Sequence, residues 1–272
     1  MTPRVRQERL DIVLVERGFA PSRTQAQALI LAGRVRSLGI RLEKPGQRIA
    51  AEAPLDVKPG PRFVSRGGLK LEAAIAAFRV RPEGLDTLDV GSSTGGFTQV
   101  LLEAGASRVA ALDVGRGQLD WSLRTDPRVV ILEGINARHL EPSALPFRPA
   151  LAVVDVSFIS LERVLPPVAA CLAPGGEIVA LVKPQFEVGR GKVGRGGIVR
   201  EPAQHAEVLA RLAAFARERE WGVAGAIPSP IRGAEGNVEF FLHLAPGRSG
   251  LEGESLAAAL EQAVRRGGEI GA

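Results

Sequence analysis

The first sixty residues carry the hydrophobic pattern of a small domain with two short helices. Spacings of three and four residues predict two amphipathic helices, and their apolar positions are Leu10, Val13, Leu14, Ala26, Leu29 and Ile30. Ser22 is a suitable N-cap for the second helix, and Gly33 ends it. The next apolar positions alternate irregularly, as in short strands; they are Val35, Leu38, Ile40, Leu42 and Ile49. Prolines and a glycine at residues 54–61 then predict an end to an α+β domain over residues 1–60, with a linker at about 57–62.

From residue 63 onward, short apolar runs alternate with helical segments. The runs are rich in Val, Leu and Ile, as in strands buried on both faces, and they span residues 85–90, 109–112, 129–132, 151–156, 178–182, 222–227 and 238–244. No helix separates the last two, which predicts an antiparallel pair at a sheet edge, and helices are expected at about 204–219 and 255–266. The pattern predicts a Rossmann-like, seven-stranded, doubly wound α/β domain over residues 63–272.

Composition and charge separate the two predicted domains. Residues 1–60 hold 11 Lys or Arg against 6 Asp or Glu, whereas residues 61–272 hold 24 of each. The excess of positive charge in the first sixty residues favours binding to a nucleic-acid phosphate backbone, with an ordinary solvated surface as the alternative. A single cysteine, Cys171, excludes an internal disulfide, and the charged start and the lack of a long apolar run predict a soluble cytoplasmic protein with no membrane partner.

A strand, a Gly-rich turn and a helix start follow one another in LDVGSSTGGFT, from Leu88 to Thr98. Asp113 ends the next strand, where it could accept both hydroxyls of a ribose. Ser93 breaks the G-x-G-x-x-G dinucleotide pattern, and Asp89 would repel a pyrophosphate but suits an ammonium and a sulfonium. The turn therefore favours S-adenosylmethionine over NAD, with a turn that binds no ligand as the alternative. The candidate cofactor residues are Asp89, Gly91, Ser92, Ser93, Thr94, Gly95, Gly96, Phe97, Asp113, Asn136 and Asp155.

Two kinds of base methylation lack their signatures in this chain. Methyltransferases of exocyclic amines carry an Asp/Asn-Pro-Pro-aromatic turn, whereas residues 155–158 read DVSF. Methylation of a ring carbon needs a cysteine nucleophile, and Cys171 lies in a helical run where a buried role is expected. Asp155 and Lys183 close the fourth and fifth strands and should face the methyl donor. Lys70 and Glu239 could complete a cluster, although each alone would more often be a surface residue.

Basic residues in both domains are candidates for RNA binding. The loop VGRGKVGRGG over residues 188–197 is expected to close over RNA phosphates, with a plain surface loop as the alternative. Phe158 is the aromatic residue best placed to stack on a target base. The candidates are Arg9, Arg23, Arg34, Arg36, Arg66, Phe158, Arg190, Lys192 and Arg195. His139, His205 and His243 are too scattered to indicate a metal.

The whole chain resembles the TlyA-type rRNA 2′-O-methyltransferases, also called hemolysin A proteins, whose catalytic domain is similar to the FtsJ-like fold. The motifs that carry the resemblance are RLDIVLVERGFAPSRTQAQALILAGRV from Arg9, FVSRGGLKLEAA from Phe63, LDVGSSTGGFT from Leu88, LEGINAR from Leu132, VVDVSFIS from Val153, LVKPQFEVGR from Leu181 and GNVEFFL from Gly236. The first motif resembles the αL RNA-binding domain of a ribosomal small-subunit protein. The resemblance implies a cytidine acceptor in large-subunit rRNA, and a second one in the small subunit for longer members.

The same resemblance implies a catalytic Lys-Asp-Lys-Glu tetrad of Lys70, Asp155, Lys183 and Glu239. A lysine that acts as a base must be uncharged, and an ordinary lysine titrates near pH ~10.4, so a second ammonium and desolvation would help. We assign the base to Lys183. Lys70 and Asp155 would tune and orient it, and Glu239 would hold the ribose or Lys70. The alternatives are a catalytically silent ribosome-assembly factor and a membrane-lytic hemolysin.

Overall fold

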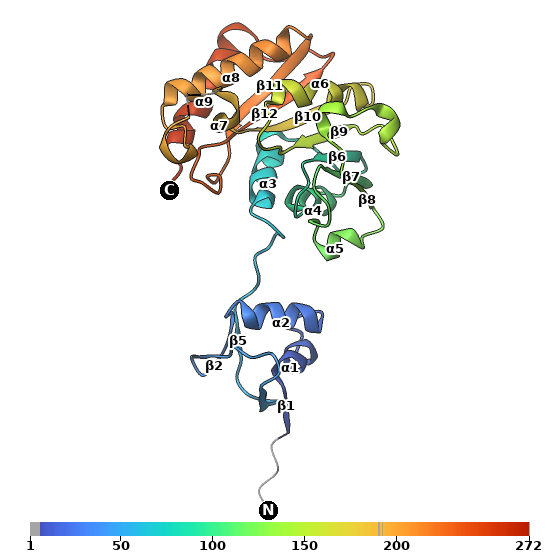
Figure 1. Ribbon diagram of the computed structural model, residues 1–272, viewed down its shortest axis with the longest axis vertical. Coiled ribbons are helices and arrows are strands. Elements are labelled where there is room, and N and C mark those ends of the chain that lie inside the picture. Colours follow the sequence, from blue (N-terminus) through green and yellow to red (C-terminus); the bar gives the residue numbers. More distant parts are fainter. Residues whose placement is uncertain (1–5, 190, 192, 272) are drawn as a thin grey trace, which may run out of the picture. The chain divides into compact units, whose positions relative to one another are not determined.

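The computed structural model describes residues 6–189, 191 and 193–271, which fall into two compact units (Figure 1). The division lies between Arg62 and Phe63, at the end of the Pro-rich stretch. Each unit has a hydrophobic core of its own. None of the helices in this part of the chain combines the length and the apolar character that a membrane span requires.

The first unit is a small α+β domain built on two packed helices. Its elements are β1 (Gln7–Arg9), α1 (Leu10–Glu16), α2 (Arg23–Leu31), β2 (Val35–Ser37), β3 (Ile40–Arg41), β4 (Arg48–Ala50) and β5 (Asp56–Val57). Leu10 and Leu14 of the first helix and Ala26 and Ile30 of the second meet in one core with Val35. Ser22 caps α2 as expected, because its hydroxyl accepts a hydrogen bond from the backbone N–H of Gln25 at 3.3 Å. Leu38 is 83% exposed at the turn between β2 and β3, so it contributes nothing to this core.

The second unit contains a seven-stranded sheet with the order β11-β12-β10-β9-β6-β7-β8. The strands are β6 (Asp86–Val90), β7 (Arg108–Asp113), β8 (Val129–Glu133), β9 (Leu151–Val154), β10 (Glu177–Val182), β11 (Trp221–Pro228) and β12 (Phe240–Pro246). β12 runs antiparallel to both β10 and β11, as the missing helix between the last two strands predicted. The chain starts in the middle at β6, fills one side and then returns to fill the other. This reversal places a crevice at the carboxyl ends of β6 and β9.

Helices cover both faces of the sheet and bury it. They are α3 (Gly67–Phe78), α4 (Gly96–Glu103), α5 (Trp121–Arg124), α6 (Leu161–Cys171), α7 (Pro184–Glu187), α8 (Pro202–Arg217) and α9 (Gly253–Gly268). On β10, Ile178, Ala180 and Val182 pack in the core under α6, α8 and α9, while Val179 and Leu181 pack in the core under α3 and α4. Burial of both side-chain sets explains why the strands read as continuous apolar runs.

Candidate active site

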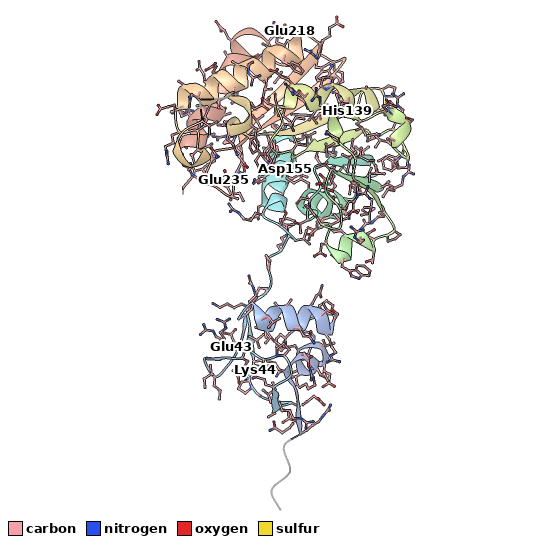
Figure 2. All side chains as sticks on the ribbon, viewed as in Figure 1. Glu43, Lys44, His139, Asp155, Glu218 and Glu235 are labelled. Atoms are coloured by element: carbon pink, nitrogen blue, oxygen red, sulfur yellow. The ribbon has the colours of Figure 1, made fainter. Side chains whose placement is uncertain are left out.

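Asp155 and Lys183 meet at the carboxyl edge of the sheet. Asp155, labelled in Figure 2, directly follows β9, and Lys183 directly follows β10, which is the parallel neighbour of β9. The Lys183 Nζ atom lies 2.6 Å from Asp155 Oδ1 and donates a hydrogen bond to Ser157 Oγ at 2.9 Å. These two contacts fix the lysine amine at the rim of the crevice. Ser157 was not among the sequence candidates, although its place two residues after Asp155 was a usable signal.

Lys70 and Glu239 form a second pair. Lys70 lies on α3, and Glu239 directly precedes β12; the Nζ and Oε2 atoms are 2.5 Å apart, and the side chains are 10% and 3% exposed. Burial raises the pKa of the Glu239 carboxyl above its ordinary value, although the charge of Lys70 acts in the opposite direction. The pair is therefore held in a place where an unpaired carboxylate would be costly.

The strand register brings the two pairs together. Val182 is the partner of Phe240 in the antiparallel pairing of β10 with β12, so the next residues outward, Lys183 and Glu239, face each other across the same two strands. The charges of Lys183 and Asp155 also act on Glu239. The four residues named from the sequence thus gather at one edge of the sheet, three of them next to a strand end and Lys70 in the first turn of α3.

A cavity of about 520 Å³ adjoins this cluster, at the carboxyl ends of β6, β7 and β9. Five of the candidate cofactor residues line it: Gly91, Ser93, Asp113, Asn136 and Asp155. The Asp113 carboxylate accepts hydrogen bonds from the backbone N–H of Ser93 at 2.8 Å and of Gly115 at 2.6 Å, which orients it at the cavity wall. Leu112, Val114 and Ile135 supply apolar walls. Such a mixture of a few fixed polar groups and apolar walls is typical of small-molecule sites.

The other candidate residues of the Gly-rich turn do not line this cavity: Asp89, Ser92, Thr94, Gly95, Gly96 and Phe97. Two of these glycines are required by packing, because a Cβ would lie 2.2 Å from Leu123 Cδ1 at Gly95 and 2.2 Å from Ser65 Oγ at Gly96. Phe97 belongs to the core. The turn motif therefore mixes residues at the cavity with residues that hold α4 against α3.

Asp89 is fully buried beneath the turn. The Thr98 hydroxyl donates a hydrogen bond to Asp89 Oδ2 at 2.6 Å, while Oδ1 has no partner among the described residues. Burial raises the pKa of this carboxyl to about 7. A buried oxygen without a partner is costly, and a cation near it would favour the charged form. This group therefore fits a ligand that carries a positive charge.

The candidate RNA-binding residues are spread over both units. Arg9 and Arg23 each lie 3.0 Å from buried Asp11, so their guanidinium groups also stabilise the fold of the first unit. The other candidate arginines with described side chains, Arg34, Arg36 and Arg66, are exposed or half-buried. Each donates a hydrogen bond to a backbone carbonyl, that of Pro59, Gly39 and Arg232 respectively.

The aromatic candidate and the loop after α7 complete the set. Phe158 is 89% exposed, and its ring lies 4.9 Å from that of Phe186. Arg190 and Lys192 lie outside the described residues. Arg195 is the first residue of a short 3₁₀ segment, η3 (Arg195–Gly197). In the part of the chain that the structure describes, no three His, Cys, Asp or Glu side chains form a group that could hold a metal.

Comparisons with known proteins give one family match in each unit. The family model of the FtsJ-like methyltransferase matches residues 63–245, and the S4 domain model matches residues 8–53. The chain is 48% identical over 263 residues to "16S/23S rRNA (cytidine-2'-O)-methyltransferase TlyA" of Mycobacterium tuberculosis, covering 96% of this chain and 97% of that one. It is 38% identical to "Hemolysin A" of Brachyspira hyodysenteriae, covering 86% and 98%. The solved structure "Putative hemolysin from Streptococcus thermophilus" superposes with a TM-score of 0.74 at 42% identity and covers 98% of each chain.

Proposed function

Because the chain belongs to the FtsJ-like methyltransferase family, we propose that it transfers the methyl group of S-adenosylmethionine to a ribose 2′-hydroxyl of ribosomal RNA. The observation that carries the proposal is the double position of Asp155. This residue lines the 520 Å³ cavity and pairs with Lys183. The cofactor site and a candidate proton acceptor therefore share a wall.

The residues around the cavity fit S-adenosylmethionine in three respects. Asp113 can accept the two ribose hydroxyls, and the apolar wall with Val114 can cover the adenine. Asp89 lies beneath the turn and outside the cavity wall, and its unpartnered Oδ1 suits a positively charged methionine end bound above it. When bound, S-adenosylmethionine supplies an electrophilic methyl group on a sulfonium. The protein contributes position, exclusion of water and proton transfer.

In this proposal Lys183 accepts the proton of the 2′-hydroxyl. Asp155 and Ser157 hold its Nζ atom from two sides, so the amine is oriented before the acceptor arrives. Lys70 supplies a second ammonium within the same cluster, and Glu239 holds Lys70 in place. The proton acceptor must be uncharged when it acts, so Lys183 has to lose its own proton before it can take that of the hydroxyl.

The acceptor we propose is a cytidine in the RNA of both ribosomal subunits. This follows the relative from Mycobacterium tuberculosis, which matches along nearly the whole chain. The S4 domain match and the excess of positive charge in residues 1–60 support an RNA anchor in the first unit. Such a substrate would place the enzyme in the cytoplasm, where ribosomal subunits are found.

The decisive experiment is methyl transfer from labelled S-adenosylmethionine to isolated 30S and 50S subunits, followed by mapping of ribose methylation. Lys183→Ala should lower the rate by about 10²–10⁴ or more while cofactor affinity changes little. Lys183→Arg should fail equally, because a guanidinium does not lose its proton near neutral pH. Arg163→Ala, at an exposed arginine of α6 outside the cluster, is the matched control. Near-normal turnover by Lys183→Arg would show that another residue is the general base. Absence of ribose methylation by the wild-type enzyme would refute the proposed function.

A further inference from the structure

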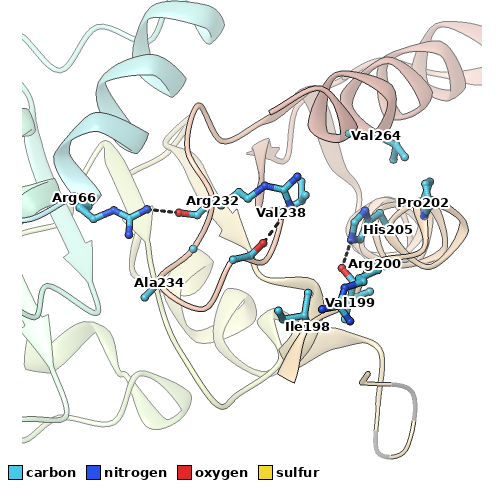
Figure 3. A pocket seen from close by; sticks show the side chains of 13 residues that line it. Arg66, Ile198, Val199, Arg200, Pro202, His205, Arg232, Ala234, Val238 and Val264 are labelled. Atoms are coloured by element: carbon cyan, nitrogen blue, oxygen red, sulfur yellow. Dashed lines mark hydrogen bonds between the residues drawn. The ribbon is translucent and has the colours of Figure 1, made fainter. Parts of the chain in front are cut away.

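A second and larger cavity, of about 760 Å³, lies in the second unit (Figure 3). Its wall comes from the start of α3, the segment before α8, the loop before β12 and α9. One wall residue, Gly233, touches the catalytic cluster, because a Cβ there would lie 2.5 Å from Glu239 Oε1. We call this space the arginine cavity, because Arg66, Arg200 and Arg232 line it.

The three arginines make the cavity positively charged. No carboxylate lines it in the described part of the chain. His205 also lines it, but burial and the nearby charge of Arg232 lower the pKa of His205, although its hydrogen bond to the Val199 carbonyl acts in the opposite direction, so the neutral imidazole is favoured. A cavity with arginine charges and no opposing carboxylate in its wall suits an anion.

The arginines differ in the donors that they have left. Arg232 donates to the carbonyls of Gly236 at 3.1 Å and of Ile270 at 2.9 Å, so its N–H groups hold the protein together. Arg66 uses one N–H on the carbonyl of Arg232 at 2.6 Å. Arg200 is exposed, and no hydrogen bond or ion pair of its side chain is found among the described residues. Arg66 and Arg200 therefore have N–H groups that can reach an anion.

We propose that the arginine cavity holds the RNA nucleotide next to the acceptor, with its phosphate on Arg66 and Arg200. The proposal rests on the proposed function and specifies how the substrate is held. Arg66 and Lys70 are four residues apart at the start of α3, about one helical turn of ~5.4 Å. A phosphate on Arg66 would thus lie one short step along an RNA chain from a hydroxyl at the tetrad. Apolar wall residues, among them Ile198, Val238 and Val264, can cover the sugar and base.

The test replaces Arg66 and Arg200 with glutamine, singly and together, and uses Arg163→Gln as the control. Arg163 is an exposed arginine of α6 that does not line the cavity, so the control removes the same charge elsewhere on the unit. Binding to ribosomal subunits is measured at several salt concentrations, together with KM, cofactor affinity and the thermal midpoint. Each cavity substitution should weaken subunit binding about ten- to a hundredfold and lower the salt slope by about one. Cofactor affinity should stay unchanged for all variants, and so should the thermal midpoint of Arg200→Gln, whereas Arg66→Gln loses its hydrogen bond to the Arg232 carbonyl and should melt slightly earlier.

The binding measurement does not depend on turnover, so the two proposals can fail separately. If the double variant binds subunits with the affinity and salt slope of Arg163→Gln, the arginine cavity holds no phosphate, whatever the enzyme methylates. If the cavity variants lose binding as expected but the wild-type enzyme transfers no methyl group, the proposed function fails, and only the phosphate site on Arg66 and Arg200 stands. A loss of binding by Arg163→Gln as large as that of Arg200→Gln would also overturn the cavity assignment, because it would show a general charge effect.

Discussion

Lys70→Met should destabilise the second unit in a way that depends on pH. The substitution removes the partner of Glu239 and leaves a carboxyl that is 3% exposed. An unpaired buried carboxylate escapes its cost by taking up a proton. Against the ordinary pKa of 4.5, protonation at pH 7 costs about 3.4 kcal/mol, at about 1.4 kcal/mol per pH unit. This is at the lower end of the roughly 3–5 kcal/mol seen when a buried ion pair loses one partner.

The pH dependence gives the prediction its sharpest form. A folded carboxyl with a raised pKa binds its proton more tightly than the unfolded chain does, so its stability contribution is complete below pH 4.5 and falls as pH rises toward the folded pKa. Removal of Lys70 raises that folded pKa further. The variant should therefore lie up to about 3 kcal/mol below the wild type at pH 7, or up to roughly 7–14 °C in thermal midpoint, and at most about 1.4 kcal/mol below it at pH 5.5.

The sequence offers a clean assay for this unit. Both tryptophans of the chain, Trp121 and Trp221, lie in the second unit, so their fluorescence during urea unfolding reports on that unit alone. The double variant Lys70→Met with Glu239→Gln should regain much of the lost stability and lose the extra pH dependence, because no buried charge is left. A loss that is the same at pH 5.5 and pH 7, or no recovery in the double variant, would show that Lys70 acts through packing and that the charge argument is wrong.

Three more predictions follow from the site and the division into units. The pKa of Asp89, raised from 3.8 to about 7, makes the free energy of unfolding of the wild type fall by up to about 4 kcal/mol as pH rises between those values. Asp89→Asn should remove this pH dependence, and urea titrations at pH 4.5 and pH 7.5 that still show the wild-type difference would contradict the prediction. Gly91→Ala should lower the free energy of unfolding by about 1–3 kcal/mol and remove most of the turnover, since φ is +85° and a Cβ would lie 2.2 Å from the Asp155 carbonyl oxygen. A variant with wild-type turnover would rule out this close approach. Deletion of residues 1–60 should leave cofactor binding by calorimetry intact and weaken rRNA binding; loss of cofactor binding would mean that the first unit is part of the cofactor site.

Sequence reasoning was strongest where a strand ends. The apolar runs located β9 and β10, so Asp155 and Lys183 could be assigned to one sheet edge from the pattern alone. The contact between Lys70 and Glu239 could not be found in that way, because it depends on how α3 packs beside β12, and that information is not local. The turn motif posed a different difficulty: Gly91 and Gly95 look alike in a sequence, but one faces the cavity while the other makes room for Leu123.

The hydrogen bonds of Arg232 to the carbonyl of Ile270 also determine when this part of the site can form during synthesis of the chain. Arg232 and Glu239 share the segment between β11 and β12, and the carbonyl that holds this segment follows α9. A nascent chain can complete the sheet once β12 has emerged, but this hydrogen bond forms only after residue 270 has been added. A chain released early, or cut before Ile270, would keep all seven strands and lack the clamp beside Glu239.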